Sequence, residues 1–151
     1  MVSINNILFC TDFSESARAA LPFAIDLTNR YGAILHIVHV YQDPGHLAEF
    51  EVSSEIQMDW IRVAHTMGTE LEKKLKEFCS EVGQELKSCH SKMLRGKPHF
   101  EIIRYAKENN IDLIVMASHG LSGWEHALFG STAERVLRES PCPVLVIRKP
   151  K

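Results

Sequence analysis

Short apolar runs alternate along the chain with longer segments in which apolar residues recur every three or four positions. The short runs are typical of strands buried on both faces, and the periodic segments predict helices with one apolar face. Capping residues and glycines at the expected helix ends support this division. Strands are predicted at residues 7–10, 34–40, 86–94, 112–117 and 143–147, and helices between Ser14 and Gly32 and at residues 56–82, 98–109 and 131–139.

This order of elements predicts an α/β fold, an open five-stranded parallel sheet with helices on both faces in a Rossmann-like arrangement. The two most apolar strands, at 7–10 and 112–117, are expected to form the central pair, and the polar strand at 86–94 to lie at an edge. Ligands of such sheets bind beyond the carboxyl ends of the strands, where the strand order reverses. We therefore expect a site between Thr11-Asp12 and the loop that begins at Ser118.

The longest predicted helix carries an apolar stripe from Ile56 to Val82, in steps of three and four residues. Trp60 and Met67 lie on this stripe. Both are expected to pack in the core rather than against a ligand.

Composition limits the partners that the chain is expected to bind. Seventeen basic and nineteen acidic side chains give a net charge of −2, which argues against a general binder of nucleic acid or membrane surfaces. No apolar run approaches the roughly 20 residues of a membrane-spanning helix. Residues 1–6 do not resemble a signal peptide, so a cytoplasmic location is expected.

The four cysteines are expected to be free thiols, buried or half-buried. They include no Cys-x-x-Cys pair, and disulfides are uncommon in cytosolic proteins. A zinc site built from Cys79, Cys89 and His90 is the alternative, but its spacing fits no ligand pattern with a mechanism behind it.

The candidate chemistry follows the fourth strand, where Ala117-Ser118-His119-Gly120 precedes nine residues and then Gly130-Ser131-Thr132. Glycines allow a backbone to approach a phosphate closely, because no Cβ intervenes. The second glycine segment opens a helix, whose free N–H groups and positive dipole end favour an anion. Ser131 and Thr132 add hydroxyl donors. Taken alone, the pattern also fits a glycine-containing loop that serves only as a helix cap.

Several segments together resemble the universal stress protein family, whose nucleotide-binding members carry Gly-x2-Gly-x9-Gly-Ser/Thr in this loop. The resemblance covers residues 1–151 and implies a single universal stress protein domain with an adenine nucleotide α-hydrolase-like fold. The other matching segments are Cys10–Ser14, His36–Val40, Gly96–Pro98 and Ser140–Val146.

The resemblance implies that these positions hold an adenine nucleotide, with ATP expected and Mg²⁺ as its companion ion. Asp12 and Val40 would frame the adenine, Ala117 would lie near the ribose, and the glycine segments would contact the phosphates. No catalytic or metal-ligating residue is assigned. The nucleotide-binding residues implied are Thr11, Asp12, Val40, Met116, Ala117, His119, Gly120, Gly130, Ser131 and Thr132.

Two features of the loop depart from a tight phosphate site. Ala117 replaces the family's first glycine, and a methyl group is harmless there if φ is negative, as expected at a strand end. Residues 117–133 contain no Lys or Arg, unlike a P-loop, whose Lys contacts the phosphates. A divalent ion near Asp12, or Arg95 or Lys97 reaching in, would supply positive charge. Binding is expected to survive with modest affinity.

The histidines are not expected to act as catalysts. His119 and His126 flank the loop, but spacing alone supports no Ser-His-Asp or Cys-His order, and a rim or packing role is expected for each. His36 and His39 are expected on opposite faces of one strand, packed and hydrogen-bonded. Trp124 is expected either to pack under the loop or to cover the site.

Three functions compete at this point. The leading hypothesis is a dimeric, nucleotide-binding stress protein that uses ATP as a regulatory ligand, with slow or no hydrolysis. The second is an interaction dimer of the same fold with an empty site, which Ala117 and the missing cations favour. The third is an enzyme of adenylyl or phosphoryl transfer, which needs a basic or metal-binding cluster that the loop lacks. No nucleic-acid or membrane partner is expected.

The homodimer is expected to pair through the last strand, Val144–Ile147. Chain order and the family resemblance place this apolar strand at a sheet edge, where it would promote association if left bare. Pairing with its twin across a two-fold axis resolves that hazard.

Overall fold

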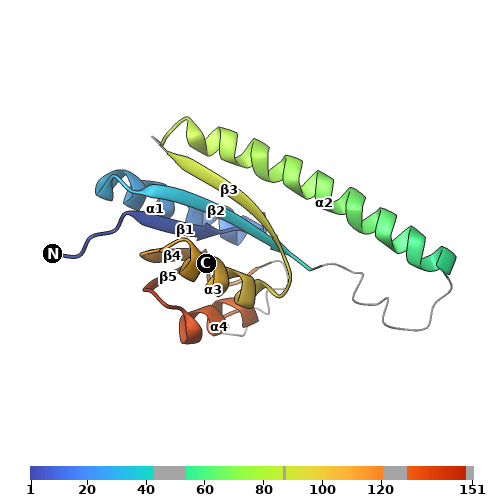
Figure 1. Cartoon of the computed structure of the whole chain (residues 1–151). Coiled ribbons are helices and arrows are strands. Elements are labelled where there is room, and N and C mark those ends of the chain that lie inside the picture. Colours follow the sequence, from blue (N-terminus) through green and yellow to red (C-terminus); the bar gives the residue numbers. More distant parts are fainter. Residues whose placement is uncertain (43–53, 87, 121–128, 149–151) are drawn as a thin grey trace.

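The computed structural model describes residues 1–42, 54–86, 88–120 and 129–148. In this part of the chain no helix is both long enough and apolar enough to cross a membrane. The strands are β1 (Asn6–Cys10), β2 (Ile34–Tyr41), β3 (Cys89–Arg95), β4 (Leu113–Ala117) and β5 (Val144–Ile147), and the helices are α1 (Glu15–Tyr31), α2 (Ser54–Gly83), α3 (Pro98–Glu108) and α4 (Ser131–Glu139) (Figure 1).

The five strands form one parallel sheet in the order β3-β2-β1-β4-β5. The predicted α/β class, the central pair of β1 and β4, and the edge position of β3 are all confirmed. β1 and β4 pair from Ile7 opposite Leu113 to Cys10 opposite Met116. The chain proceeds from β1 to one edge and from β4 to the other, so the strand order reverses between these two strands.

Each face of the sheet is covered by two helices, because alternate side chains of every strand point to opposite faces. Ile7 and Phe9 of β1 pack in one apolar cluster with residues of α1 and α2. Leu8 and Cys10 pack in a second cluster with residues of α3 and α4. The central strands are therefore buried on both sides, as their continuous apolar runs predict.

The boundaries of β3 differ from the expected ones. The strand begins at Cys89 rather than at Leu86. The chain makes a turn after α2, in which Glu85 N–H donates to the Val82 carbonyl, and the bond from Leu35 N–H to the Ser88 carbonyl opens the ladder. Leu86 therefore lies after the turn that follows α2 and before β3 begins, and its apolar side chain packs against the core.

α2 extends beyond the sheet, which its apolar stripe did not predict (Figure 1). Its 30 residues span about 45 Å, whereas the seven residues of β3 span about 23 Å. Leu75, Phe78 and Val82 in the C-terminal part are buried against the sheet. Met67 is 48% exposed, so the expectation that it packs in the core is wrong. The side chain of Trp60 lies outside the described part of the structure.

A carboxylate joins the starts of the two central strands. Asp112 precedes β4, and its Oδ2 accepts hydrogen bonds from the backbone N–H groups of Asn5 (2.8 Å) and Asn6 (2.9 Å) at the start of β1. The donors are the first residue of β1 and the residue before it, so this side chain helps to set the register between β1 and β4.

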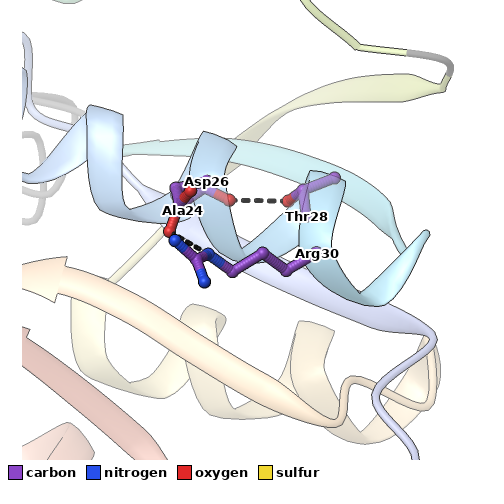
Figure 2. A network of polar contacts seen from close by, with 4 residues as sticks. All are labelled: Ala24, Asp26, Thr28 and Arg30. Carbon is purple, nitrogen blue, oxygen red and sulfur yellow. Dashed lines mark hydrogen bonds and ion pairs between the residues drawn. The ribbon is translucent and has the colours of Figure 1, made fainter.

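The carboxylate of Asp26 on α1 forms an exposed ion pair, which serves as a comparison for Asp112 (Figure 2). Asp26 Oδ2 accepts from Arg30 Nε at 2.7 Å, and the two side chains are 59% and 72% exposed. The neighbouring Thr28 is buried, and its hydroxyl donates to the Ala24 carbonyl at 2.7 Å. Water competes for the Asp26–Arg30 pair, so this pair adds little to stability.

We predict that Asp112→Ala lowers the free energy of unfolding by about 1–2 kcal/mol, because two backbone donors lose a charged acceptor. The matched control, Asp26→Ala, should change it by less than about 0.5 kcal/mol. Urea denaturation of both variants measures the difference. Equal effects of the two changes would contradict this role for Asp112.

Candidate functional site

The turn after β1 places Thr11 and Asp12 where the strand order reverses. The hydroxyl oxygen of Thr11 accepts from Phe13 N–H at 3.0 Å. Asp12 Oδ1 accepts from Ser14 N–H at 2.9 Å. Side-chain bonds of this kind to the backbone two residues on stabilise tight turns. The Asp12 side chain is thereby fixed, with its other oxygen lying against Gly120.

Phe13 adopts a left-handed backbone conformation, with φ 63°, at a cost of about 1–2 kcal/mol. Its ring centroid lies 4.7 Å from that of His39 on β2 and 6.1 Å from that of Phe78 on α2. His39 Nδ1 also lies 2.8 Å from the Thr11 carbonyl oxygen. That oxygen can only accept, so Nδ1 carries the proton and donates. β2 and α2 together hold the strained turn in place.

On the other side of the crevice, α4 begins at a glycine. Gly130 is the N-cap residue, and its N–H donates to the Ser118 carbonyl at 2.7 Å. α1 begins differently, because the hydroxyl oxygen of its N-cap Ser14 accepts from Ala17 N–H at 3.1 Å. With no side chain to cap it, α4 presents its first N–H groups and its positive dipole end to the crevice.

Two glycines of the site lie close to neighbouring groups, at backbone conformations that other residues also adopt. A Cβ on Gly120 would collide with Oδ2 of Asp12. A Cβ on Gly130 would lie 3.3 Å from the Ser118 carbonyl oxygen and 3.6 Å from the His119 Cα. The described ends of the loop therefore pass close to the β1–α1 turn and to each other.

Ala117, which replaces a glycine of the family pattern, is accommodated without strain. It is the last residue of β4 and is buried. The non-glycine residues with positive φ in the described part of the chain are Phe13 and Asn110, so φ at Ala117 is not positive. The expected absence of a positive φ at Ala117 is confirmed, and a methyl group fits an extended backbone.

These elements enclose a pocket of about 190 Å³ at the carboxyl ends of β1, β2 and β4. Segments more than a hundred positions apart in the sequence meet there. Nine of the ten residues implied by the resemblance line this pocket: Thr11, Asp12, Val40, Met116, Ala117, Gly120, Gly130, Ser131 and Thr132.

His119 is the implied residue that does not line the pocket. Its Nδ1 lies 3.0 Å from the hydroxyl oxygen of Ser118. The expectations for His126 and Trp124 concern residues 121–128, which lie outside the described part of the structure.

The pocket is also lined by five residues that were not among the expected site residues: Cys10, Ala17, Val38, Pro98 and Ile102. One of them carried a usable signal, because Val38 is two positions before the expected site residue Val40 and so shares its face of the strand. Ile102 is four positions after Pro98 and shares its face of the helix, but neither residue was expected at the site. Which helix face meets the end of which strand is a property of the fold.

The pocket combines an apolar wall with a polar rim. Val38, Val40, Met116 and Ile102 form a wall that suits a flat apolar ring. The rim offers the carboxylate of Asp12, hydroxyl groups and helix N–H groups. Such a combination can bury a base and orient an attached polar group.

Positive side chains are absent from the described lining of this pocket. Arg95 lines a separate hollow of about 490 Å³ between α2 and β3, and Lys97 lines neither. We call the pocket of about 190 Å³ the switch-point pocket, because it lies where the strand order reverses. An anion in it would therefore meet dipoles and hydroxyl groups rather than full positive charges.

The fold and its crevice define a Rossmann-like α/β protein with a site at the reversal of strand order. The model of the universal stress protein family matches residues 3–148, and the chain belongs to this family. Universal stress protein MJ0531 of Methanocaldococcus jannaschii is 34% identical over 148 residues, which are 96% of this chain and 82% of that protein.

Solved structures agree with this assignment. That of MJ0577 from Methanocaldococcus jannaschii superposes with a TM-score of 0.86 at 25% identity, over 99% of both chains. That of UspA from Lactobacillus plantarum gives a TM-score of 0.83 at 25% identity, over 98% of this chain and all of the other.

The histidines of β2 are hydrogen-bonded on opposite faces, as expected. His36 contacts Tyr105 of α3, with Nδ1 3.0 Å from the hydroxyl oxygen, whereas His39 faces Phe13 and α2. Burial lowers the pKa of both rings below 6.5, and in His39 the Thr11 carbonyl and Asp12 oppose this shift in part. A proton therefore binds the unfolded chain more readily than the folded one.

We predict that the free energy of unfolding falls as pH is lowered below about 6.5, by up to about 1.4 kcal/mol per pH unit for each buried histidine. His39→Gln should reduce this slope, because Gln donates to the Thr11 carbonyl without titrating. Denaturation at pH 7.5 and 5.5 measures it, with His65→Gln, on an exposed ring, as the control. An unchanged slope in His39→Gln would contradict the assignment.

Proposed function

We propose that this universal stress protein binds an adenine nucleotide, ATP in the first instance, at the switch-point pocket and uses it as a regulatory ligand. The observation that carries the proposal is the convergence of the β1–α1 turn, the end of β4 and the start of α4 on one pocket. An apolar wall and an uncapped helix N-terminus at one site suit a ligand with a flat base and an anionic group.

In the proposed complex the base packs against the apolar wall near Val40, and Asp12 accepts a hydrogen bond from the base or the ribose. The phosphates extend toward Gly120 and the first turn of α4. There, the N–H groups and the hydroxyl groups of Ser131 and Thr132 act as donors. The volume of about 190 Å³ corresponds to part of such a ligand, and the phosphates extend over the loop.

Two solved structures of universal stress proteins with bound nucleotides support this proposal at the level of the fold. Universal stress proteins solved in complex with cAMP and, from Archaeoglobus fulgidus, with dAMP have TM-scores of 0.64 and 0.65 to this chain. At 21% identity the likeness concerns the fold alone. It supports the proposal because the same fold accommodates adenine nucleotides in other proteins.

The lack of cations argues for a regulatory ligand rather than a substrate. Phosphoryl transfer requires positive charge on the transferred group, which Lys, Arg or metal ions usually supply. Asp12 is the carboxylate among the described lining residues, so Mg²⁺ would be held mainly by the nucleotide's own phosphates. We therefore propose slow hydrolysis at most.

Purified protein should release an adenine nucleotide on acid denaturation, or, if nucleotide-free, gain thermal stability with Mg-ATP. At about ten times the dissociation constant, Tm should rise by about 3–6 °C, since the ligand binds only the folded chain. Nucleotide-free protein that shows no shift at millimolar Mg-ATP would favour the second candidate, an interaction protein with an empty site. Ala117, the small volume and the cation-free lining are the features on which that alternative rests.

Gly130→Asp should abolish the shift, because it places a negative charge at the start of α4, where the phosphates would lie. Asp is a favourable N-cap residue, so folding should be retained and loss of binding can be told from unfolding. Gly83→Asp is the matched control, since a Cβ there meets nothing within 4 Å. Retained binding in Gly130→Asp would show that the nucleotide lies elsewhere.

We also propose that the protein is a cytoplasmic homodimer that pairs through β5. β5 is the sheet edge next to β4, and all four of its residues are half-exposed. The carbonyls of Pro143 and Ile147 accept from Ile114 and Ser118 and so face the sheet. Backbone groups alternate in direction along a strand, so those of Val144 and Val146 point outward, toward a second copy.

Val146→Pro should therefore raise the dimer dissociation constant by at least about tenfold. The change removes one outward-facing N–H from each protomer, so the symmetric dimer loses two hydrogen-bond donors at its interface. The β4–β5 ladder should survive, since the lost donor faces away from β4. Val146→Thr keeps the N–H and a branched side chain and serves as the control. Sedimentation velocity measures the equilibrium, and an intact Val146→Pro dimer would place the interface elsewhere.

A further inference from the structure

The hollow of about 490 Å³ between α2 and β3 is separate from the switch-point pocket and shares no lining residue with it. Its lining comes from the end of β2, from one face of α2 and from β3, beside which α2 runs (Figure 1). Its volume lies in the range of about 300–1,000 Å³ that is typical of ligand sites. The hollow is therefore large enough to receive side chains of a bound molecule.

The strand beside the hollow is an edge of the sheet, and half of its backbone groups point away from the sheet. Leu35 N–H donates to the Ser88 carbonyl, and Gly96 N–H donates to the Tyr41 carbonyl, so positions 88 and 96 face β2. Backbone groups alternate in direction along a strand, and in the described part of the chain no strand pairs with the outer side of β3. The outward positions that border the hollow are Ser91, Met93 and Arg95.

The hollow extends around this outer edge. Met93 packs in the apolar cluster that contains α2, so the face of β3 that carries Met93 is turned to α2. Lys92 lies on the opposite face, because side chains alternate along a strand, and yet it also lines the hollow. A chain that paired with the edge of β3 would therefore lie against the hollow.

The ionisable side chains give the hollow a positive charge. Lys76, Lys92 and Arg95 line it. Glu72 is the carboxylate among the described lining residues, and its Oε1 lies 3.2 Å from Lys76 Nζ. His65, the histidine of this lining, is exposed. An anionic group in the hollow would meet more positive than negative charge.

This charge argues against a second copy of β3 as the occupant of the edge. The strand contains Lys92 and Arg95 and no Asp or Glu, so pairing with its twin would bring like charges together across the junction. β5, at the other edge, carries no charged residue. Basic side chains on an edge strand oppose its self-association, but they attract an acidic strand.

We propose that the edge of β3 and the hollow beside it bind an acidic peptide segment of a partner protein, which adds to the sheet as an extended strand. The main chain of the segment bonds to the outward N–H and carbonyl groups of β3. Asp or Glu side chains at alternate positions of the segment enter the hollow, where Lys76, Lys92 and Arg95 lie. Strand addition takes its affinity from main-chain hydrogen bonds and its specificity from pockets for alternate side chains.

The proposal goes beyond nucleotide binding and does not depend on it. The two hollows have separate linings, so each can be tested without the other. A failed nucleotide assay leaves the peptide site standing, and the reverse also holds.

A fluorescent peptide of alternating Glu and Thr, with the seven-residue length of β3, tests the proposal by anisotropy with the full chain. It should bind saturably, and its dissociation constant should rise by at least about threefold between about 50 mM and about 300 mM salt, because salt screens exposed charges. A fully N-methylated version keeps the charges without backbone donors and should bind at least about tenfold more weakly.

Three outcomes of the peptide assay would overturn the proposal. The first is no saturable binding at about 1 mM peptide. The second is equal binding of the N-methylated peptide, which would leave a site for carboxylates without strand addition. The third is equal binding of a peptide with Lys in place of Glu, which would remove the role of charge.

Two variants locate the peptide on β3. Ser91→Pro removes an outward N–H and spares the bonds to β2, and it should weaken peptide binding by at least about threefold. Val146→Pro is the matched control, because it removes an outward N–H from the opposite edge and should keep the wild-type affinity. Sedimentation velocity should show that Ser91→Pro leaves the dimer intact. Loss of the dimer in Ser91→Pro would make a second copy the occupant and overturn the proposal.

Lys92→Glu tests the charge of the hollow and should weaken peptide binding by at least about tenfold, because it places a carboxylate against those of the peptide. Lys107→Glu, on the exposed side of α3, makes the same change in net charge and should keep the affinity within about twofold. Circular dichroism checks that each variant folds. Equal binding by Lys92→Glu and Lys107→Glu would place the peptide elsewhere.

Discussion

The parallel pairing of β1 with β4 is the constraint on which the rest of the structure depends. Both strands are buried on two faces, and the carboxylate of Asp112, just before β4, accepts from the first residue of β1. The chain proceeds from this pair to opposite edges of the sheet, so the connections after β1 and β4 diverge. The crevice between these connections is a consequence of topology, and the side chains around it only refine its shape.

The crevice is lined by a turn that the sheet and α2 hold in an unfavourable conformation. The left-handed Phe13 is packed by the rings of His39 and Phe78, and His39 also donates to the turn's backbone. Strain of this kind persists only where surrounding contacts maintain it. α2 therefore supports the site from a distance, because Phe78 contacts the turn.

The electrostatics of the pocket are the reason for proposing a regulatory ligand rather than a substrate. A helix N-terminus and backbone N–H groups attract an anion by partial charges, each worth less than a full cation. The close approach of Gly120 to Asp12 adds a negative group to the same site. Such a site can distinguish the shape of a ligand, but it provides little stabilisation for the charge that develops in phosphoryl transfer.

Most of the fold, and the place of the site within it, follow from the sequence. Periodicity, caps and glycines predict nine elements, and the apolar character of residues 7–10 and 112–117 predicts the central pair. These signals are local, because alternation and helical spacing reflect which face of each element is buried. The family resemblance adds the site residues, and the structure brings nine of the ten together around one pocket.

The tertiary structure decided what depends on contacts between distant elements. It showed that α2 overhangs the sheet, so Met67 is exposed although its spacing matches that of Leu75 and Phe78. It added Pro98 and Ile102 to the pocket and left His119 out of it. The physical reason is common to these cases: spacing identifies the apolar face of an element, whereas its neighbours are set by how long helices and strands pack against one another.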